Sequence, residues 1–366
     1  MKKVVLSVTN DFTADQRIQR MANYLVTNGF EVCVIARKLP NSLPLDKFSY
    51  KIIRMNLCFK KGKFFYLEYQ IRLFFQLLFL AADIFTANDL DTLLPNFLVA
   101  RLRKKRLIYD THEYFTQVPE LIHRPFTQKI WTTLEQWIFP KLETTITVND
   151  SLVRIYGELY QKKVHAIYNV PTRKEILHAK NAQPKVLIYQ GALNKDRGIE
   201  LMIATMAFLP DYELWIVGRG DIEENIKAQA ISFKNVVFKG FFKPNDLYLL
   251  TQQATLGLSL EKAEALNYVY ASPNKVFDYV QAEVPVLISD FPENRKLLEQ
   301  YQVGEIVPLA AQNPADLSQK IREMCEDEAK YQHYVATCKT AKLELCWEKE
   351  SQKLAAIYGT GESVLC

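Results

Sequence analysis

The amino-acid sequence predicts an α/β protein with two doubly wound parallel-sheet domains. Its 366 residues exceed the roughly 250–300 over which a single hydrophobic core usually grows. Short apolar segments typical of buried strands alternate with segments of helical periodicity along both halves of the chain. Between the halves, residues 171–184 are polar and unpatterned, which indicates a linker.

The chain opens with a strand, a helix and a second strand. Residues 4–8 and 32–36 are short, apolar and branched, and between them Ile18, Met21 and Leu25 recur at helical spacing. This order predicts parallel strands joined by a right-handed crossover. The glycine fingerprint of dinucleotide binding is missing between the strands, which counts against a dehydrogenase.

Further strands and helices are expected before the linker. The expected strands are residues 83–87, 107–110 and 144–148, and the expected helices are residues 131–142 and a helix capped by Ser151 that runs through Leu159.

Within residues 59–85, Lys60, Lys61 and Lys63 precede a very apolar, aromatic run. A buried crossover helix, apolar all round, accounts for the run, and we favour this interpretation of the helix. The three lysines with Phe64 and Phe65 are the better candidate for contact with a membrane surface, because lysines bind phosphates and aromatic rings enter the interface.

Polar residues follow two strands of the first half. Asn10 and Asp11 come after the first strand, and Asp110, His112 and Glu113 come at the end of the strand at 107–110. A lone histidine is more often structural than catalytic. Ligands of open parallel sheets bind at the carboxyl ends of strands, however, so this cluster indicates a functional site.

The second half repeats the pattern with glycines at strand ends. A strand at 186–190 ends in Gly191, which would let a backbone approach a ligand, and Arg197 stands before the next helix, where it could grip phosphate oxygens. Gly218 follows a strand at 213–217, and Phe242 follows another at 235–240. Phe242 would line a base pocket or pack in the core.

The stretch from Asn267 to Glu293 carries a helix start and a buried strand. Pro273 is suited to a helix entrance, and the free N–H groups of such a start attract anions. Lys275 adds a positive charge, and Asp278, one turn later, could accept hydroxyl hydrogens. These groups suit a nucleoside diphosphate, and the alternative is an ordinary helix cap with a surface lysine and aspartate.

Charge and cysteine content limit the class of protein. Residues 1–170 carry 24 Lys and Arg against 15 Asp and Glu, and the remainder carries 22 against 26. The basic half suggests an anionic surface or acceptor, or simply a solvated basic face. Six cysteines without metal-ligand spacing, a start that runs directly into a strand, and no long uncharged apolar run predict a cytoplasmic protein without a spanning helix.

Six motifs in order give the sequence a family resemblance. They are NDFTADQRIQRMANYL, IYDTHEYF, YQGALNKDRGIE, LWIVGRGD, NVVFKGFF and NYVYASPNKVFDYVQAEVPVLISD. The chain resembles two-domain GT-B glycosyltransferases, most closely the retaining enzymes of family 4. The resemblance implies two Rossmann-like domains facing a cleft: an acceptor-side domain over 1–170, a donor domain over 185–340, and a helix at about 341–358 that crosses back onto the first domain.

The resemblance also implies roles for individual residues. Arg197 and Lys275 would contact the donor diphosphate, Asp278 would bind the ribose, and His112 would lie against the transferred sugar. The other implied residues are Gly191, Gly218, Phe242, Tyr270 and Asn274 on the donor side and Asn10 and Asp11 on the acceptor side.

Two positions depart from the family pattern. Tyr270 stands where the family has the first of two glutamates eight positions apart, and Ala192 stands where the family often has arginine. Both changes bear on the identity of the sugar. Asn267, Tyr268 and Asn274 are candidates to take over the sugar contacts.

The implied reaction transfers a sugar, with retention, from a UDP- or GDP-linked donor to a hydroxyl. It would need no metal, because cationic side chains stabilise the leaving diphosphate. The expected partners are a glycan or lipid-linked acceptor of polysaccharide assembly and a membrane surface at Lys60, Lys61 and Lys63, with no nucleic acid. Peripheral attachment to the inner membrane face is left open. The rival readings are a non-catalytic GT-B scaffold and a GT-B nucleotide-sugar epimerase.

Overall fold

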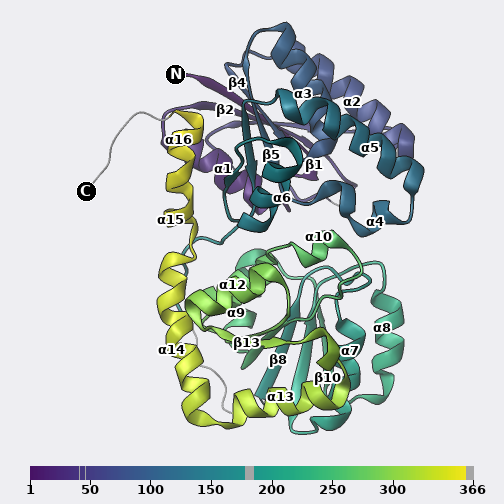
Figure 1. Cartoon of the computed structure of the whole chain (residues 1–366), viewed down its shortest axis with the longest axis vertical. Helices are drawn as coiled ribbons and strands as arrows, with labels where there is room; N and C mark the ends of the chain where they lie inside the picture. Colours follow the sequence, from purple (N-terminus) through teal and green to yellow (C-terminus); the bar gives the residue numbers. More distant parts are fainter. Residues whose placement is uncertain (41, 46, 178–184, 360–366) are drawn as a thin grey trace. The chain divides into compact units, whose positions relative to one another are not determined.

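A computed structural model describes residues 1–40, 42–45, 47–177 and 185–359, and its chain divides into two compact units (Figure 1). The first unit comprises Met1–Tyr168 together with the chain from Ser351 onward, and the second comprises Asn169–Glu350. Each unit is a parallel sheet with helices on both faces, so the predicted α/β fold with two doubly wound sheets is confirmed. Part of the expected linker, residues 178–184, lies outside the described residues.

The first sheet has the strand order β3-β2-β1-β4-β5-β6-β7, with all its strands parallel. Its strands are β1 (Lys3–Asp11), β2 (Glu31–Arg37), β3 (Lys51–Met55), β4 (Ile84–Asn88), β5 (Arg106–Thr111), β6 (Thr144–Thr147) and β7 (His165–Ala166). Its helices are α1 (Gln16–Thr27), α2 (Gly62–Phe79), α3 (Leu90–Leu102), α4 (Pro119–Ile122), α5 (Pro125–Ile138), α6 (Asp150–Tyr160) and α16 (Leu354–Tyr358). Strands β3 and β7 were not predicted.

The second sheet has the order β10-β9-β8-β11-β12-β13, again with parallel strands. Its strands are β8 (Lys185–Gln190), β9 (Tyr212–Val217), β10 (Val236–Gly240), β11 (Leu256–Ser259), β12 (Val286–Ser289) and β13 (Gly304–Val307). Its helices are α7 (Ile199–Thr205), α8 (Glu223–Gln229), α9 (Pro244–Thr251), α10 (Leu266–Val269), α11 (Asn274–Gln281), α12 (Pro292–Tyr301), α13 (Pro314–Glu326), α14 (Glu328–Glu344) and α15 (Trp347–Glu350).

Apolar side chains that alternate along the strands build a core on each face of the second sheet. Leu187 and Leu214 point to one face, where α7 and α13 cover them, while Ile188 and Trp215 point to the other, where α9, α11 and α14 lie. Two-sided burial explains why these strands read as continuous apolar runs. The arrangement leaves the loops at the carboxyl ends of the strands free to carry polar groups.

Two helix starts differ from the prediction. Helix α5 begins at Pro125 rather than at residue 131, because proline at the first helical position loses no hydrogen bond there. Helix α6 is capped by Asn149, whose side chain accepts a hydrogen bond from the N–H of Leu152, so the assignment of the cap to Ser151 was wrong.

We had favoured a helix that is apolar and buried on every side for this segment. Helix α2 is instead buried on one side only. It buries Phe65, Tyr69, Leu73 and Leu77 against the first sheet. Its opposite side exposes a row of large apolar side chains: Phe64, Leu67, Ile71, Phe75 and Phe79. Within the described ranges, no helix combines the length and the apolarity needed to cross a membrane.

The continuous helix expected at about 341–358 is interrupted. Helix α14 ends at Glu344, and the N–H of Trp347 donates to the carbonyl of Pro171 instead of continuing the helical ladder. Helical structure resumes in short segments, of which α16 packs in the first unit. There the buried Tyr358 hydroxyl lies 3.1 Å from Thr86 Oγ1 in β4, and Arg106 bonds to the carbonyl of Ile357.

A glycine in β11 allows a close contact that positions helix α11. A Cβ added to Gly257 would lie 2.3 Å from a ring carbon of the fully buried Tyr279. We therefore expect Gly257→Ala to destabilise the protein by about 1–3 kcal/mol through overpacking, measured as a lower free energy of unfolding in urea.

Gly157→Ala in α6 is the matched control. A Cβ there would lie 3.5 Å from the carbonyl oxygen of Lys162, an ordinary van der Waals contact, so the change should be neutral or should stabilise by about 0.5–1 kcal/mol. Equal effects of the two substitutions would show that the Tyr279 ring can move away from β11 at no cost.

Candidate functional site

Two glycines let backbone segments touch at the carboxyl edge of the second sheet. Gly191 follows β8 with a φ of 141°, and its N–H donates to the carbonyl of Val217. Gly218 follows β9 with the same φ, and a Cβ added to it would lie 1.8 Å from the carbonyl oxygen of Gly191. Both positions therefore require glycine, and neither places a side chain over this edge.

A buried carboxylate brings the two predicted phosphate-binding cations together. Glu261, just after β11, accepts a hydrogen bond at Oε1 from Lys275 Nζ at 2.6 Å. Arg197 Nη1 lies 3.6 Å from the same oxygen. Because Glu261 is 2% exposed and Arg197 keeps 27% of its side chain exposed, the charged groups run from the interior to the surface.

Aromatic rings flank both cations. The ammonium group of Lys275 lies 4.5 Å from the centroid of the Tyr189 ring, and the guanidinium of Arg197 lies 4.4 Å from that of Tyr268. The faces of aromatic rings attract cations, so these contacts hold the two positive groups in place without neutralising their charge.

The charges of the cluster shift the pKa values of its members. Burial lowers the pKa of Lys275, and the neighbouring Arg197 pushes it in the same direction, while Glu261 opposes both. Burial acts to raise the pKa of Glu261, but Lys275 and Arg197 outweigh it and hold that pKa below its ordinary value. Glu261 is thus a carboxylate, and with Lys275 and Arg197 both protonated the three groups together carry one net positive charge.

A buried hydroxyl fixes helix α11 against the strand ends. Tyr279 Oη accepts from the N–H of Gln190 at 3.1 Å and lies within 3.3 Å of the carbonyl oxygens of Ile188 and Leu258. The side-chain amide of Gln190 lies 3.4 Å from Asp278 Oδ2. Asp278 therefore faces the end of β8, one turn along the helix from Lys275.

The remaining predicted donor residues are spread over three segments. Asn274, at the start of α11, accepts from Asn169 at 3.0 Å, and Tyr270 is half-buried at the end of α10. Phe242 packs against the core on the α9 and α11 face, which favours the core interpretation that we left open for it. Its neighbour Phe241 is 58% exposed, with the Arg219 guanidinium 5.6 Å from its ring centroid.

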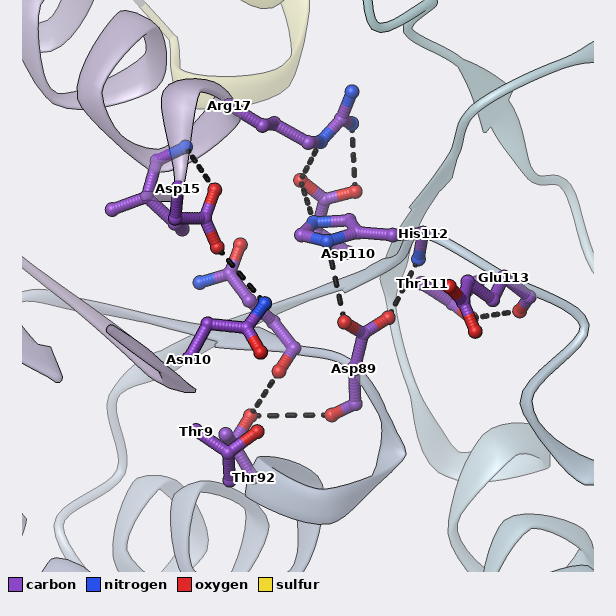
Figure 2. A network of polar contacts seen from close by, with 12 residues as sticks. Thr9, Asn10, Asp15, Arg17, Asp89, Thr92, Asp110, Thr111, His112 and Glu113 are labelled. Atoms are coloured by element: carbon purple, nitrogen blue, oxygen red, sulfur yellow. Dashed lines mark hydrogen bonds and ion pairs between the residues drawn. The ribbon is translucent and has the colours of Figure 1, made fainter. Parts of the chain in front are cut away.

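In the first unit, His112 lies between two carboxylates (Figure 2). The backbone N–H of His112 donates to Asp89 Oδ1 at 2.8 Å, and its ring Nδ1 lies 3.2 Å from Asp89 Oδ2. The other ring nitrogen lies 3.3 Å from Asp110 Oδ2. Asp110 is also held by Arg17, whose Nε and Nη2 donate to its two oxygens at 3.1 and 2.8 Å.

These carboxylates keep the imidazole charged. Burial acts to lower the pKa of His112, but the negative charges of Asp89 and Asp110 outweigh it and raise the pKa to about 10. Burial likewise acts to raise the pKa of Asp110, which Arg17 and His112 nevertheless hold well below its ordinary range. At neutral pH His112 is therefore a fixed cation and not a proton acceptor.

The two predicted acceptor-side residues lie at the end of β1 and take part in the turn into α1. Asn10 is exposed and donates to Asp15 Oδ2 at 3.2 Å, and Asp15 caps the helix. Asp11 is buried and accepts from the N–H and the hydroxyl of Thr13. Both contacts are local, and they account for these residues without a ligand.

Four charged residues of these clusters were not among the predicted sites: Arg17, Asp89, Asp91 and Glu261. Asp89 follows β4 directly and Glu261 lies two residues after β11, so their place at a carboxyl end was a usable signal. Arg17 stood next to Ile18 on the apolar face of α1, where a charge needs a partner. Asp91 is buried, and burial together with the charge of Asp89 raises its pKa to about 8.

Comparison with known proteins assigns the family. A model described as Glycosyltransferase Family 4 matches residues 14–170, and one described as Glycosyl transferases group 1 matches residues 172–340. The chain belongs to the family 4-like glycosyltransferases. The family resemblance inferred from the six motifs is thereby confirmed. No protein with a curated description matches the sequence of this glycosyltransferase.

Solved structures show that this glycosyltransferase has the GT-B fold. Sucrose-phosphate synthase from Thermosynechococcus elongatus is similar with a TM-score of 0.79 and 16% identity over 98% of each chain. WaaG, a glycosyltransferase involved in lipopolysaccharide biosynthesis, gives 0.73 and 15% over 97% of this chain and 100% of its own. Anabaena Alr3699/HepE in complex with UDP and glucose gives 0.74 and 14% over 99% and 100%.

The charge of His112 should be visible in the stability of the protein. Because its pKa in the folded state lies above the ordinary 6.5, its contribution is complete below about pH 6.5 and is lost as the pH rises through about 10. We expect His112→Gln to lower the free energy of unfolding by about 1.5–3 kcal/mol near pH 6 and by much less near pH 10.

Urea unfolding across this pH range measures the difference, and His123→Gln is the control, since His123 is exposed at the end of α4. A loss for His112→Gln that is the same at every pH would contradict a charged imidazole.

Proposed function

We propose that this glycosyltransferase moves a sugar from a nucleoside-diphosphate sugar to a hydroxyl acceptor, with retained anomeric configuration. The observation that carries the proposal is the cluster of Arg197, Lys275 and Glu261 at the carboxyl edge of the second sheet. Its net positive charge suits a diphosphate, and Asp278 lies one helical turn away, where a ribose hydroxyl could donate to it. Retention rests on the resemblance to the retaining enzymes of family 4.

The chemistry that the cluster supplies is electrostatic. As the bond from the anomeric carbon to the diphosphate breaks, negative charge grows on the leaving oxygens, and fixed cations stabilise it more than they stabilise the bound donor. One such contact is worth about 2–4 kcal/mol of the barrier. Metal independence is part of this proposal, because Arg197 and Lys275 would do the work of a cation.

The base of the donor is proposed to be uracil or guanine. Alr3699/HepE was solved with UDP and glucose, and trehalose-6-phosphate from E. coli is described as bound with UDP-2-fluoro glucose, which favours the uridine nucleotide. The assembly of a polysaccharide or a lipid-linked glycan is the setting we propose, in keeping with WaaG, which acts in lipopolysaccharide biosynthesis.

Lys275 offers an explanation for the departure at Ala192. Its Cε lies 3.5 Å from where a Cβ on Gly191 would be, directly beside the position at which the family often carries arginine. We propose that Lys275 supplies the positive charge that Ala192 lacks. Tyr270 brings no carboxylate to the sugar, and Asn267, Tyr268 and Asn274 stay the candidates for those contacts.

In the first unit we propose that the network around His112 serves the acceptor and the transferred sugar, together with Asn10 and Asp11. As a charged imidazole, His112 would donate hydrogen bonds rather than remove the proton of the acceptor hydroxyl. Its two carboxylate partners hold the ring in one orientation, which a positioning role requires.

The exposed row on α2 supports attachment to an anionic membrane surface. Five large apolar side chains recur at helical spacing, and Lys60, Lys61 and Lys63 are exposed at the start of the helix. Helix α5, in the same group of helices in Figure 1, exposes Phe126, Ile130 and Trp137. Apolar side chains beside lysines fit lipid chains beneath negative headgroups, so we propose a cytoplasmic enzyme bound to the inner membrane face.

Nucleotide binding tests the donor site. A ligand at 100 times its dissociation constant stabilises a protein by about 2.7 kcal/mol, which a thermal-shift assay detects with UDP or GDP. We expect Arg197→Ala to abolish the shift and Lys195→Ala, an exposed change in the same loop, to preserve it. An undiminished shift in Arg197→Ala would remove this residue from the site.

Asp278→Asn tests the ribose contact. We expect it to weaken UDP or GDP by about tenfold, which corresponds to one lost hydrogen bond to a charged group, and to leave inorganic pyrophosphate unaffected. Equal losses for both ligands would argue against a ribose contact. A protein that neither binds nor hydrolyses any nucleotide sugar would be a scaffold rather than a transferase.

Vesicle sedimentation tests the membrane surface, with phosphatidylcholine alone or mixed with phosphatidylglycerol. Each lysine near an anionic surface adds about 1 kcal/mol, so replacing Lys60, Lys61 and Lys63 by alanine should weaken binding to the anionic vesicles roughly 100-fold. Phe75→Ser should weaken it as well, and the control Ile231→Ser, an exposed apolar side chain in the second unit, should not. Vesicle binding of equal strength with and without phosphatidylglycerol would overturn the proposal. A dimer that Phe75→Ser dissociates would overturn it as well, because the exposed row would then be a contact between two copies of the chain.

A further inference from the structure

A negative charge at the centre of a diphosphate site needs an explanation. Glu261 is buried, and a carboxylate there repels the anion that Arg197 and Lys275 are proposed to bind. Its presence therefore lowers diphosphate affinity unless it does something that the cations cannot do alone. Nothing in the six sequence motifs assigns it a role.

The backbone of Glu261 is tied to the loop that carries Arg197. The N–H of the next residue, Lys262, donates to the carbonyl of Asp196 at 2.9 Å. Gly198 has a φ of 75°, and a Cβ there would lie 2.1 Å from the carbonyl oxygen of Leu260. The segment after β11 and the loop before α7 thus form one rigid block.

The side chain of Glu261 is fixed as firmly. Its Oε2 accepts from Ser259 at 2.8 Å, which leaves Oε1 turned to Lys275 and Arg197. Its carbonyl accepts from Ser289 at the end of β12. A carboxylate held at both oxygens and at the backbone can define where two long, flexible cationic side chains end.

We propose that Glu261 is a positioning residue for the donor diphosphate, holding Lys275 in its charged form and both cations at the carboxyl edge before the nucleotide arrives. This inference rests on the proposed function, because it assigns Glu261 a task within the same site. The energetic reason is that the buried Lys275 and the half-buried Arg197 repel each other, and one shared carboxylate offsets that repulsion.

The proposal predicts a particular dependence on pH. Burial and Arg197 already lower the pKa of Lys275, and Glu261 is the group that opposes them. Removing its charge should lower that pKa further, so that Lys275 loses its proton at a lower pH. The charged or titratable groups that act directly on Lys275 are Glu261, Arg197 and Tyr189. Around these three groups lie Tyr268, Glu200, Tyr279 and Asp278.

The experiment measures the affinity of Glu261→Gln and of the wild type for UDP, GDP and inorganic pyrophosphate between about pH 6 and pH 9.5 by calorimetry. At the acidic end we expect the variant to bind at least as tightly, since an anion-repelling charge is gone. At the alkaline end we expect the variant to bind about tenfold more weakly, as the alkaline limb moves to lower pH.

Two further variants identify the titrating group. In a Lys275→Gln background, Glu261→Gln should no longer move the alkaline limb. Glu264→Gln, an equal change of charge at an exposed position in the same loop, should leave both affinity and pH dependence as in the wild type. Glu261→Asp keeps the charge on a shorter arm, and we expect weaker binding with the alkaline limb unmoved, which also covers the case in which the glutamine variant fails to fold.

The outcomes separate this inference from the proposed function. If the wild type binds none of the three ligands, the donor site fails and the role of Glu261 fails with it. If the wild type binds and Glu261→Gln loses the same factor of affinity at every pH, the donor site stands and Glu261 has only a structural role. A crossing of the two affinity curves supports the inference, because a merely structural residue would not produce it.

Discussion

Parallel strands send every chain exit at their carboxyl ends to the same edge of a sheet, and both polar clusters of this protein depend on that constraint. In the second unit the exits of β8, β9 and β11 carry Gly191, Gly218 and Glu261. In the first unit the exits of β4 and β5 carry Asp89 and His112. Residues separated by tens of positions in the sequence become neighbours at this edge, because adjacent parallel strands place their following loops there. Helices cover both faces of the sheet and leave the edge to these loops.

The two clusters use opposite arrangements of charge. In the first unit one imidazole lies between two carboxylates, and Arg17 completes a set whose charges cancel. In the second unit one carboxylate lies between two cations and leaves a positive charge. A neutral network holds its members rigid and has little attraction for ions, whereas the cationic one suits the diphosphate we propose. The difference is consistent with the division into acceptor and donor sides that the family resemblance implies.

Much of the fold could be predicted from the sequence, because two-sided burial makes parallel strands read as apolar runs. The segments around β1, β8 and β12 were found in this way, as was the alternation with helices. The exposed row on α2 could not be found, since the helix is apolar on both sides and periodicity alone does not say which side meets the sheet. Asn149 and Pro125 show the same limit at helix starts, where one hydrogen bond or one proline moves the boundary.

The candidate site was predicted in part. Arg197 and Lys275 were expected to lie close together, and both lie beside Oε1 of Glu261. Glu261 itself was not predicted. A diphosphate site is expected to contain positive charges, and a carboxylate works against that expectation. Arg17 was missed for a related reason, because its partner Asp110 lies 93 residues further along the chain and only the folded sheet joins them.

The anchoring of Tyr358 has a consequence for how the protein is made. The first unit includes α16, which follows the second unit in the sequence. The contact between the buried hydroxyl of Tyr358 in α16 and Thr86 can therefore form only after the second unit has been synthesised. At about 5–20 residues per second, roughly 10–40 s pass between the emergence of Tyr168 and that of Tyr358 from the ribosome. During that interval the first unit lacks α16, so its packing is completed no earlier than that of the second unit, which extends to Glu350.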